Sequence, residues 1–192
     1  QQNLMQRVAI DGLTHISDNH HRGLMFDEEA RVYMTTAELV QAGHNMRAIL
    51  GRKLDMIGFD ACYMSMLEIW YLLSDCARIG VGSSDIELAT GWNYLGIMQA
   101  LQKSGLSGED VAKIIVSSYR QFYNGRTPHF TQSAIKLKDT KKIKDNLDAI
   151  SKKLNASMNT FGNTFRHVLI KARKATLEFA NPMFIDLRSF YH

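Results

Sequence analysis

The hydrophobic pattern predicts an amphipathic helix between Thr35 and Leu50. Thr35 and Glu38 have the spacing of a capping box, in which each side chain satisfies a backbone N–H at the start of a helix. After this start, apolar residues recur every three or four positions, which is the period of one helical face. The predicted apolar stripe consists of Leu39, Ala42, Met46, Ile49 and Leu50.

Two apolar runs then meet at Cys62. The run from Leu54 to Phe59 (LDMIGF) has the length of a strand buried on both faces, as in a parallel sheet. The run from Tyr63 to Asp75 is apolar at nearly every position and holds no Gly or Pro, which predicts a mostly buried helix. Asp60-Ala61-Cys62 therefore forms a sharp junction between a predicted strand and a predicted helix.

The rest of the chain continues this alternation of strands and helices. Further strands are predicted over Ala77–Ser83, Ser133–Leu137 and Phe184–Leu187, with a polar loop over Ser84–Tyr94. Helices are predicted after Ser107, over Thr140–Leu154 and over Phe165–Lys174. The alternation predicts an α/β layered fold with a mostly parallel central sheet flanked by helices. The length of 192 residues predicts one domain over residues 1–192.

Charge and hydropathy narrow the classes of partner. The net charge is +4, but the basic residues gather only between Lys136 and Lys153, where Asp139, Asp145 and Asp148 interrupt them. This pattern is typical of a solvated helix face and predicts no nucleic-acid partner. No run of about 20 apolar residues occurs, so no membrane span is expected.

The two cysteines are expected to be free thiols. Cys62 and Cys76 would lie at opposite ends of the predicted helix, and that separation exceeds the reach of a disulfide. No Cys or His pair has the spacing of a zinc site, and neither a complete EF-hand loop nor a Gly-rich phosphate loop occurs. We therefore expect no metal site and no cofactor.

Cys62 has two interpretations on residue spacing alone. A single cysteine after a strand is more often a small buried hydrophobe than a nucleophile. At a helix N-terminus, however, free N–H groups and the positive end of the macrodipole favour the reactive thiolate and can hold an oxyanion. Asp60 is likewise either a cap for the next helix or an anion that pairs with a cationic substrate side chain.

The sequence from Lys53 to Tyr71 (KLDMIGFDACYMSMLEIWY) resembles the catalytic-cysteine region of the clostripain family. The family consists of caspase-like bacterial cysteine peptidases that cleave after Arg or Lys. The resemblance lies in the apolar strand, then Phe59-Asp60-Ala61-Cys62, and then Met64, Glu68 and Tyr71. Ser83-Ser84 with Gly91-Trp92-Asn93-Tyr94 resembles the family's next active-site loop. Ala172-Arg173 and Asp186-Leu187-Arg188-Ser189-Phe190 resemble its later landmarks.

This resemblance implies a caspase-like fold and an endopeptidase that works through a Cys-His dyad and an acyl-enzyme. Cys62 would be the nucleophile, and Asp60 would contribute to the pocket for the basic P1 residue. Ser84 and Asp85 would line the cleft and contact substrate. Asp85 and Glu87 are further carboxylates that could face a cation there, although solvated loop charges are the ordinary expectation. The resemblance also implies protein or peptide substrates and a secreted or cell-envelope location.

The histidine of the dyad is left open by the sequence. The family's histidine is followed directly by glycine, and no His-Gly pair occurs here. His15 precedes Cys62 by 47 residues, near the roughly 50-residue separation of the caspase pattern. His20, His21 or a histidine upstream of Gln1 are the alternatives. We expect His44, His129, His167 and His192 to be surface or packing residues.

Several expectations concern the extent and state of the chain. Because it begins with Gln1 rather than Met, we interpret it as a partial catalytic domain, with an upstream chain of the same polypeptide as a candidate partner. The family's maturation by cleavage implies that Arg22 or Arg31 is a processing site. The rival interpretations are an inactive relative that acts in binding or regulation, and an unrelated α/β protein with a buried cysteine.

Overall fold

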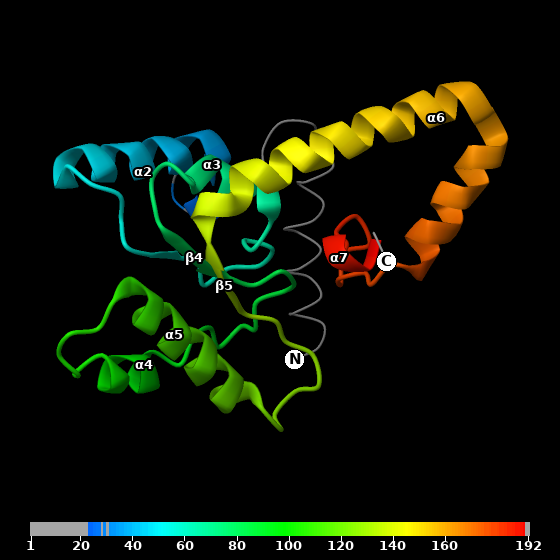
Figure 1. The fold of residues 1–192 in the computed structure, drawn as a ribbon. Coiled ribbons are helices and arrows are strands. Elements are labelled where there is room, and N and C mark those ends of the chain that lie inside the picture. Colours follow the sequence, from blue (N-terminus) through cyan, green and yellow to red (C-terminus); the bar gives the residue numbers. More distant parts are fainter. Residues whose placement is uncertain (1–22, 28, 30, 191–192) are drawn as a thin grey trace. The chain divides into compact units, whose positions relative to one another are not determined.

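The computed structural model describes residues 23–27, 29 and 31–190 (Figure 1). The chain divides into two compact units, Gln1–Lys138 and Asp139–His192. The residues that carry the motif around Cys62 all belong to the first unit. One catalytic domain over residues 1–192 remains a prediction.

The described part of the first unit begins with a hairpin that leads into a helix. Strand β1 (Gly23–Asp27) pairs antiparallel with β2 (Val32–Thr35), and helix α2 (Thr36–Leu50) follows at once. The capping box is present, since the Glu38 N–H donates to Thr35 Oγ1 at 3.2 Å and the Thr35 N–H to Glu38 Oε2 at 2.7 Å. The predicted helix is therefore confirmed.

The buried face of α2 differs from the predicted stripe. Its buried residues are Leu39 and Gly43, whereas Ile49 is 85% exposed and Leu50 is also exposed. The apolar period is correct for a helix, but only its first member, Leu39, reaches the core. Gly43 is the second buried residue of α2, because the absence of a side chain lets Cys76 pack closely against this position of the helix.

The central sheet is mixed rather than mostly parallel. Its strands are β3 (Ile57–Gly58), β4 (Ile79–Gly82) and β5 (Ser133–Lys136), in that spatial order. The β3–β4 pair is parallel, and a parallel bridge between Leu54 and Ala77 extends it, but β5 runs antiparallel to β4. The alternation of the β5 sequence indicates a strand without giving its direction, so the expectation of a mostly parallel sheet is not confirmed.

Helices pack on both faces of this sheet, as Figure 1 shows for α2 and α3 (Leu67–Leu73) on one side and α4 (Tyr94–Ala100) and α5 (Gly108–Tyr123) on the other. The α3-side core consists of Leu39, Phe59, Met64, Ile69, Trp70, Leu73, Cys76, Ala77 and Leu137. The α5-side core consists of Ile79, Val81, Trp92, Ile97, Ala112, Ile115, Tyr119 and Tyr123. The layered arrangement of helices around a sheet is therefore present.

Strand β4 is buried along its whole length and is shaped differently on its two faces. Ile79 and Val81 belong to the α5-side core. On the other face Gly80 carries no side chain, and a Cβ there would lie 2.5 Å from the Trp70 ring. The Trp70 indole, 1% exposed, consequently lies directly on the strand backbone.

The helix after Ser107 is confirmed as α5, and α4 was not predicted. Ser107 and Asp110 form a second capping box, with the Asp110 N–H donating to Ser107 Oγ at 3.2 Å. Helix α4 has only seven residues and begins where Asn93 Oδ1 accepts the Gly96 N–H at 3.3 Å. Its exposed Leu95 and Met98 give a weak apolar period, which explains why the hydrophobic pattern did not reveal it.

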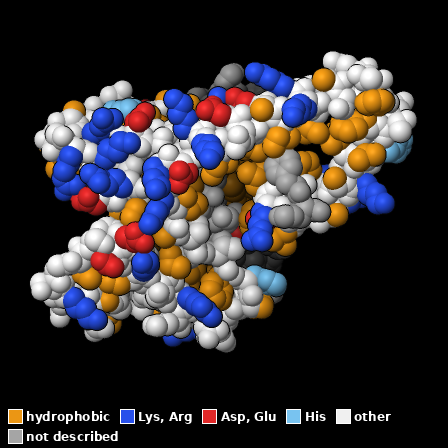
Figure 2. Space-filling model, in the orientation of Figure 1, with side chains coloured by type: hydrophobic (Ala, Val, Ile, Leu, Met, Phe, Trp, Pro, Cys, Tyr) orange, Lys and Arg blue, Asp and Glu red, His pale blue; other side chains and the backbone are white. Residues whose placement is uncertain are grey.

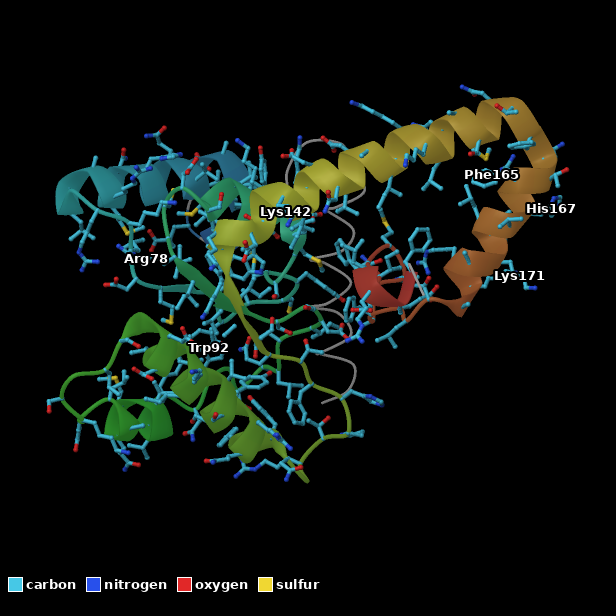
Figure 3. The ribbon with its side chains drawn as sticks, viewed as in Figure 1. Arg78, Trp92, Lys142, Phe165, His167 and Lys171 are labelled. Atoms are coloured by element: carbon cyan, nitrogen blue, oxygen red, sulfur yellow. The ribbon has the colours of Figure 1, made fainter. Side chains whose placement is uncertain are left out.

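The second unit consists mainly of one interrupted helix, α6 (Thr140–Ala175). Gly162 has φ 52° and ψ −128° and breaks it between the two helices that were predicted. Figure 3 shows Phe165, His167 and Lys171 on the segment after this break. A bridge between Glu178 and Ile185 stands in place of the predicted last strand, and α7 (Leu187–Phe190) follows.

Candidate active site

The chain that leaves β3 and the chain that leaves β4 remain side by side beyond the sheet. The Phe59 N–H donates to the Val81 carbonyl at 2.9 Å, and the Tyr63 N–H donates to the Asp85 carbonyl at 3.0 Å. Parallel strands bring their carboxyl ends to one edge of a sheet, where α/β proteins place their binding sites. The segment with Asp60 and Cys62 therefore lies against the post-β4 loop, residues 83–93.

Cys62 does not lie at a helix N-terminus, so that expectation is wrong. It lies in a turn, Tyr63 has φ 57°, and α3 begins only at Leu67. The N–H groups of Tyr63 and Ser65 donate to carbonyls of the post-β4 loop, so these residues cannot enter the helix. The same two N–H groups are not free to hold an oxyanion, and both cysteines lie outside α3.

The Cys62 thiol is exposed and contacts the backbone of Glu87. Both cysteines are free, as expected, and Cys76 is buried. The Glu87 N–H donates to Cys62 Sγ at 3.2 Å. Partial withdrawal of the sulfur from water raises the pKa of the Cys62 thiol, and the carboxylates of Glu87 and Asp85 raise it further, against the lowering effect of the Glu87 N–H. The neutral thiol therefore needs a base to become a nucleophile at neutral pH.

Asp60 presents an exposed carboxylate that the post-β4 loop holds in place. Its Oδ2 accepts the Trp92 N–H at 3.0 Å and the Tyr94 hydroxyl at 2.8 Å. Gly91 adopts φ 66°, and a Cβ there would lie 2.5 Å from Asp60 Oδ2, so both conformation and space call for glycine. The capping role considered for Asp60 is not found, because the N-cap of α3 is Met66, without a side-chain hydrogen bond.

Ser84 and Asp85 are half-buried, and hydrogen bonds tie their backbone into the post-β4 loop. The backbone N–H groups of Ser84 and Asp85 both donate to Thr131 Oγ1 at 3.1 Å, and Asp85 Oδ1 accepts the Ile86 N–H at 2.8 Å. Thr131 Oγ1 also lies 2.7 Å from the hydroxyl of the fully buried Ser83. Thr131, far along the chain, thus fixes the loop, and no local pattern in the sequence marks it.

Glu87 is buried, against the expectation of a solvated loop charge. Its side chain points among groups from α5 and from the segment before Cys62, and the residue is 8% exposed. Burial raises the pKa of Glu87 to about 7, and the Asp60 charge acts in the same direction, while the neighbouring Tyr119 hydroxyl opposes it. Neither carboxylate oxygen has a hydrogen-bond partner of standard geometry in the described part of the chain.

The candidate bases fall largely outside the described residues. His15, His20, His21, His192 and Arg22 belong to the undescribed ranges. His44, His129 and His167 are exposed, as expected of surface residues, and no histidine among residues 23–27, 29 and 31–190 hydrogen-bonds to Cys62 Sγ. Arg31, the other expected processing site, lies exposed in the turn between β1 and β2.

Charges on the first unit are mixed in sign. Figure 2 shows basic and acidic side chains interspersed over the face that it draws. Arg52 and Arg78 pair with Asp55, and Lys113 and Lys136 pair with Glu109. Within the described residues, no three Cys, His, Asp or Glu side chains gather as metal ligands. No helix in that same part of the chain is long and apolar enough to cross a membrane.

The model of the clostripain family matches residues 11–190. The chain belongs to the clostripain family. The resemblance seen around Phe59-Asp60-Ala61-Cys62 is thereby confirmed, and the family is one of cysteine peptidases. No curated protein gives a significant match.

Solved clostripain-type proteases share the fold. A clostripain from Bacteroides thetaiotaomicron, in complex with the peptide inhibitor BTN-VLTK-AOMK, is 25% identical with a TM-score of 0.51, over 69% of this chain and 54% of that one. A B. fragilis cysteine protease is 22% identical with a TM-score of 0.50, over 62% and 49%. A secreted C11 cysteine protease of B. thetaiotaomicron, iotapain, is 24% identical with a TM-score of 0.50, over 72% and 37%. The match spans about half the length of the first two proteases.

Proposed function

We propose that this clostripain-family chain carries the nucleophile and the P1 pocket of an endopeptidase that cleaves after Arg or Lys. The observation that carries the proposal is the placement of Cys62 and Asp60. An exposed thiol and an exposed carboxylate stand two residues apart, and the post-β4 loop holds both. A cationic side chain bound at Asp60 would bring the following peptide carbonyl toward Cys62 Sγ.

The reaction is nucleophilic catalysis through an acyl-enzyme. A histidine takes the thiol proton, Sγ attacks the peptide carbonyl, and the same histidine returns the proton to the leaving amine. Water then hydrolyses the thioester. His15 is the proposed base, with His20, His21 and an upstream histidine as alternatives. The raised pKa of the Cys62 thiol supports the need for such a base.

The preference for a basic P1 residue is proposed from Asp60. Its Oδ2 is already held by two donors, Trp92 N–H and Tyr94 Oη, while no hydrogen bond to Oδ1 occurs within the described residues. Oδ1 would therefore accept a guanidinium or ammonium group. Ser84 and Asp85 would line the pocket through the loop backbone. The inhibitor bound to the B. thetaiotaomicron clostripain has the peptide VLTK, with lysine last, which supports the same preference here.

Secretion and maturation by cleavage are part of the same proposal. Iotapain is described as a secreted protease, which supports an extracellular or cell-envelope location for this chain. Arg31 lies exposed in the turn between β1 and β2, a position where a protease could reach it.

Replacing Cys62 by Ala tests the proposal. We expect Cys62→Ala to abolish hydrolysis of peptide amides with Arg or Lys at P1, because no other exposed thiol occurs among the described residues. The matched control is Cys76→Ala, which removes the buried thiol of the α3-side core and should leave hydrolysis in place. Retained hydrolysis in Cys62→Ala would overturn the assignment of the nucleophile.

A second candidate function is binding without catalysis. The raised pKa of Cys62 and the lack of a histidine bonded to its sulfur in the described part of the chain favour it. Such a relative would bind peptides with Arg or Lys through Asp60 and release them uncleaved. Calorimetric binding of a basic peptide together with no turnover by the wild-type chain would distinguish this function from the first.

A further inference from the structure

Glu87 joins the nucleophile to the interior of the first unit. Its backbone N–H donates to Cys62 Sγ at 3.2 Å, and its carbonyl oxygen lies 3.9 Å from the same sulfur. The residue is 8% exposed, and neither carboxylate oxygen has a hydrogen-bond partner of standard geometry within the described residues, although the Tyr119 hydroxyl is a neighbour. A buried carboxyl without a well-formed hydrogen bond is costly when ionised, so its presence beside a thiol requires an explanation.

The titratable groups that interact with the Glu87 carboxyl come from the segment after β3, from α4 and from α5. Its charge raises the pKa of Cys62, and the Asp60 charge raises the pKa of Glu87 itself. From the other side, the Glu87 charge contributes to the raised pKa values of three tyrosines at the start of α4 and along α5. The facing groups are therefore Cys62, Asp60, Tyr94, Tyr119 and Tyr123.

None of these described groups is a cation. Two of the groups that interact with the Glu87 charge become anionic themselves, the Asp60 carboxyl and the Cys62 thiol. Ionised Glu87 therefore opposes loss of the thiol proton, and the burial of Glu87 limits the screening of this repulsion by solvent. A positive charge placed at Asp60 would offset both carboxylates at once.

We propose that Glu87 couples the charge of the bound substrate to ionisation of the Cys62 thiol. In the empty site the Glu87 carboxylate adds to the effects of burial and of Asp85 in keeping the thiol protonated. A guanidinium or ammonium group at Asp60 removes this opposition, and the thiol then loses its proton to the base or to water. The substrate side chain thus prepares the nucleophile that attacks it. This coupling rests on the proposed function, because Asp60 is the site at which the cation binds.

Glu87 is a positioning residue in this scheme, since it acts through Cys62 without touching the reacting carbonyl. Two consequences separate this role from a merely structural one. The two interacting acids should titrate as a pair, so that the ionisation of Cys62 in the free protein spreads over a wide pH range. A neutral ligand of the same shape should leave that titration unchanged.

The test is the pH dependence of Cys62 alkylation in the full chain. Iodoacetamide reacts with the thiolate, forming a bond from Sγ to carbon and releasing iodide, and mass spectrometry of peptides separates Cys62 from the buried Cys76. Agmatine serves as the cation, because it carries a guanidinium group and no carbonyl to be attacked. Butylurea is the neutral control ligand.

We expect agmatine to lower the midpoint of alkylation in the wild-type chain by about one pH unit, and butylurea to leave it unchanged. Glu87→Gln should lower the midpoint by a similar amount without ligand and should respond little to agmatine. The matched control, Glu109→Gln, removes an exposed carboxylate that pairs with Lys113 and Lys136 and should behave as wild type. An unchanged midpoint in Glu87→Gln would overturn the coupling.

Asp60→Asn keeps the test decisive even where Glu87→Gln does not fold. This variant should abolish the response of the wild-type thiol to agmatine while Glu87 is intact. A full response in Asp60→Asn would overturn the proposal. The assay needs no turnover, so it also separates the two proposals: a shifted midpoint without peptide hydrolysis would support the coupling and reject the peptidase.

Discussion

At the scale of single residues, Asp60 combines two tasks that one carboxylate can perform together. Its Oδ2 anchors the post-β4 loop through Trp92 and Tyr94. Its charge is the feature that a basic P1 side chain would recognise. An amide in its place keeps an oxygen acceptor for the two donors but carries no charge, so substitution by Asn separates the structural task from the electrostatic one.

We expect Asp60→Asn to reduce kcat/KM for Arg and Lys substrates by roughly 10- to 100-fold, since a charge-assisted hydrogen bond contributes about 1.5–3 kcal/mol. The loss should appear mainly in KM. Steady-state kinetics with Arg and with its neutral isostere citrulline at P1 measure it. Tyr94→Phe, which removes one donor and leaves the carboxylate, is the control for loop anchoring. An equal loss for both substrates would reject the charge-recognition role.

At the scale of elements, local hydrogen bonds explain which predictions succeeded. The starts of α2 and α5 could be predicted because Thr35 with Glu38, and Ser107 with Asp110, make their capping bonds within four residues. The helix expected from Tyr63 begins only at Leu67, because the Tyr63 and Ser65 N–H groups bond to a loop some twenty residues away. The direction of β5 and the placement of Thr131 likewise depend on contacts that no local pattern contains.

The contact between α2 and the chain at Cys76 gives a prediction at this scale. A Cβ at Gly43 would lie 3.0 Å from Cys76 Sγ and 3.1 Å from Cys76 Cβ, so Gly43→Ala forces apart two closely packed segments. We expect a loss of about 1–3 kcal/mol in the free energy of unfolding, measured by urea denaturation.

Two controls accompany Gly43→Ala, one at the adjacent residue His44 and one at Cys76, which Gly43 contacts. His44→Ala, at an exposed position of the same helix, should change the free energy of unfolding by less than about 0.5 kcal/mol. Adding Cys76→Ala to Gly43→Ala should recover part of the loss, because the clashing sulfur is gone. Additive effects of the two substitutions would show that the predicted contact does not limit stability.

At the scale of the whole molecule, the site depends on segments that the chain brings together from three regions. Asp60 and Cys62 follow β3, Glu87 follows β4, and Tyr119 belongs to α5. The sequence identified Asp60 and Cys62 because they form a compact motif. It did not indicate the burial of Glu87, since Asp85 and Glu87 are charged residues of a stretch predicted as a polar loop, and the covering helix α5 lies far along the chain.

Burial of Glu87 should make the stability of the protein depend on pH. The pKa of Glu87 is raised in the folded chain to about 7 from an ordinary 4.5, so between these values the folded state binds more protons than the unfolded state. The contribution of Glu87 to the free energy of unfolding is therefore most favourable at low pH and is lost as the pH rises from 4.5 through about 7. Glu87→Gln should match wild type near pH 4.5 and exceed it above pH 7, by on the order of 1–3 kcal/mol.

Urea denaturation of both chains at several pH values measures this difference. Glu109→Gln is the control, because the same chemical change at an exposed position should give no comparable difference above pH 7. A Glu87→Gln chain that gains nothing as the pH rises would show that Glu87 is ionised at no cost in the folded protein.

The contact of the Trp70 ring with the bare backbone of Gly80 restricts how this sequence can change during evolution. A side chain at position 80 would enter the space of the indole, and a smaller residue at position 70 would leave a void over the strand. Either substitution alone lowers stability and therefore fitness. When both occur together, a larger side chain at position 80 can fill the space that a smaller residue at position 70 leaves. We therefore expect positions 70 and 80 to covary among relatives, with compensated pairs such as a smaller residue at 70 beside a larger one at 80.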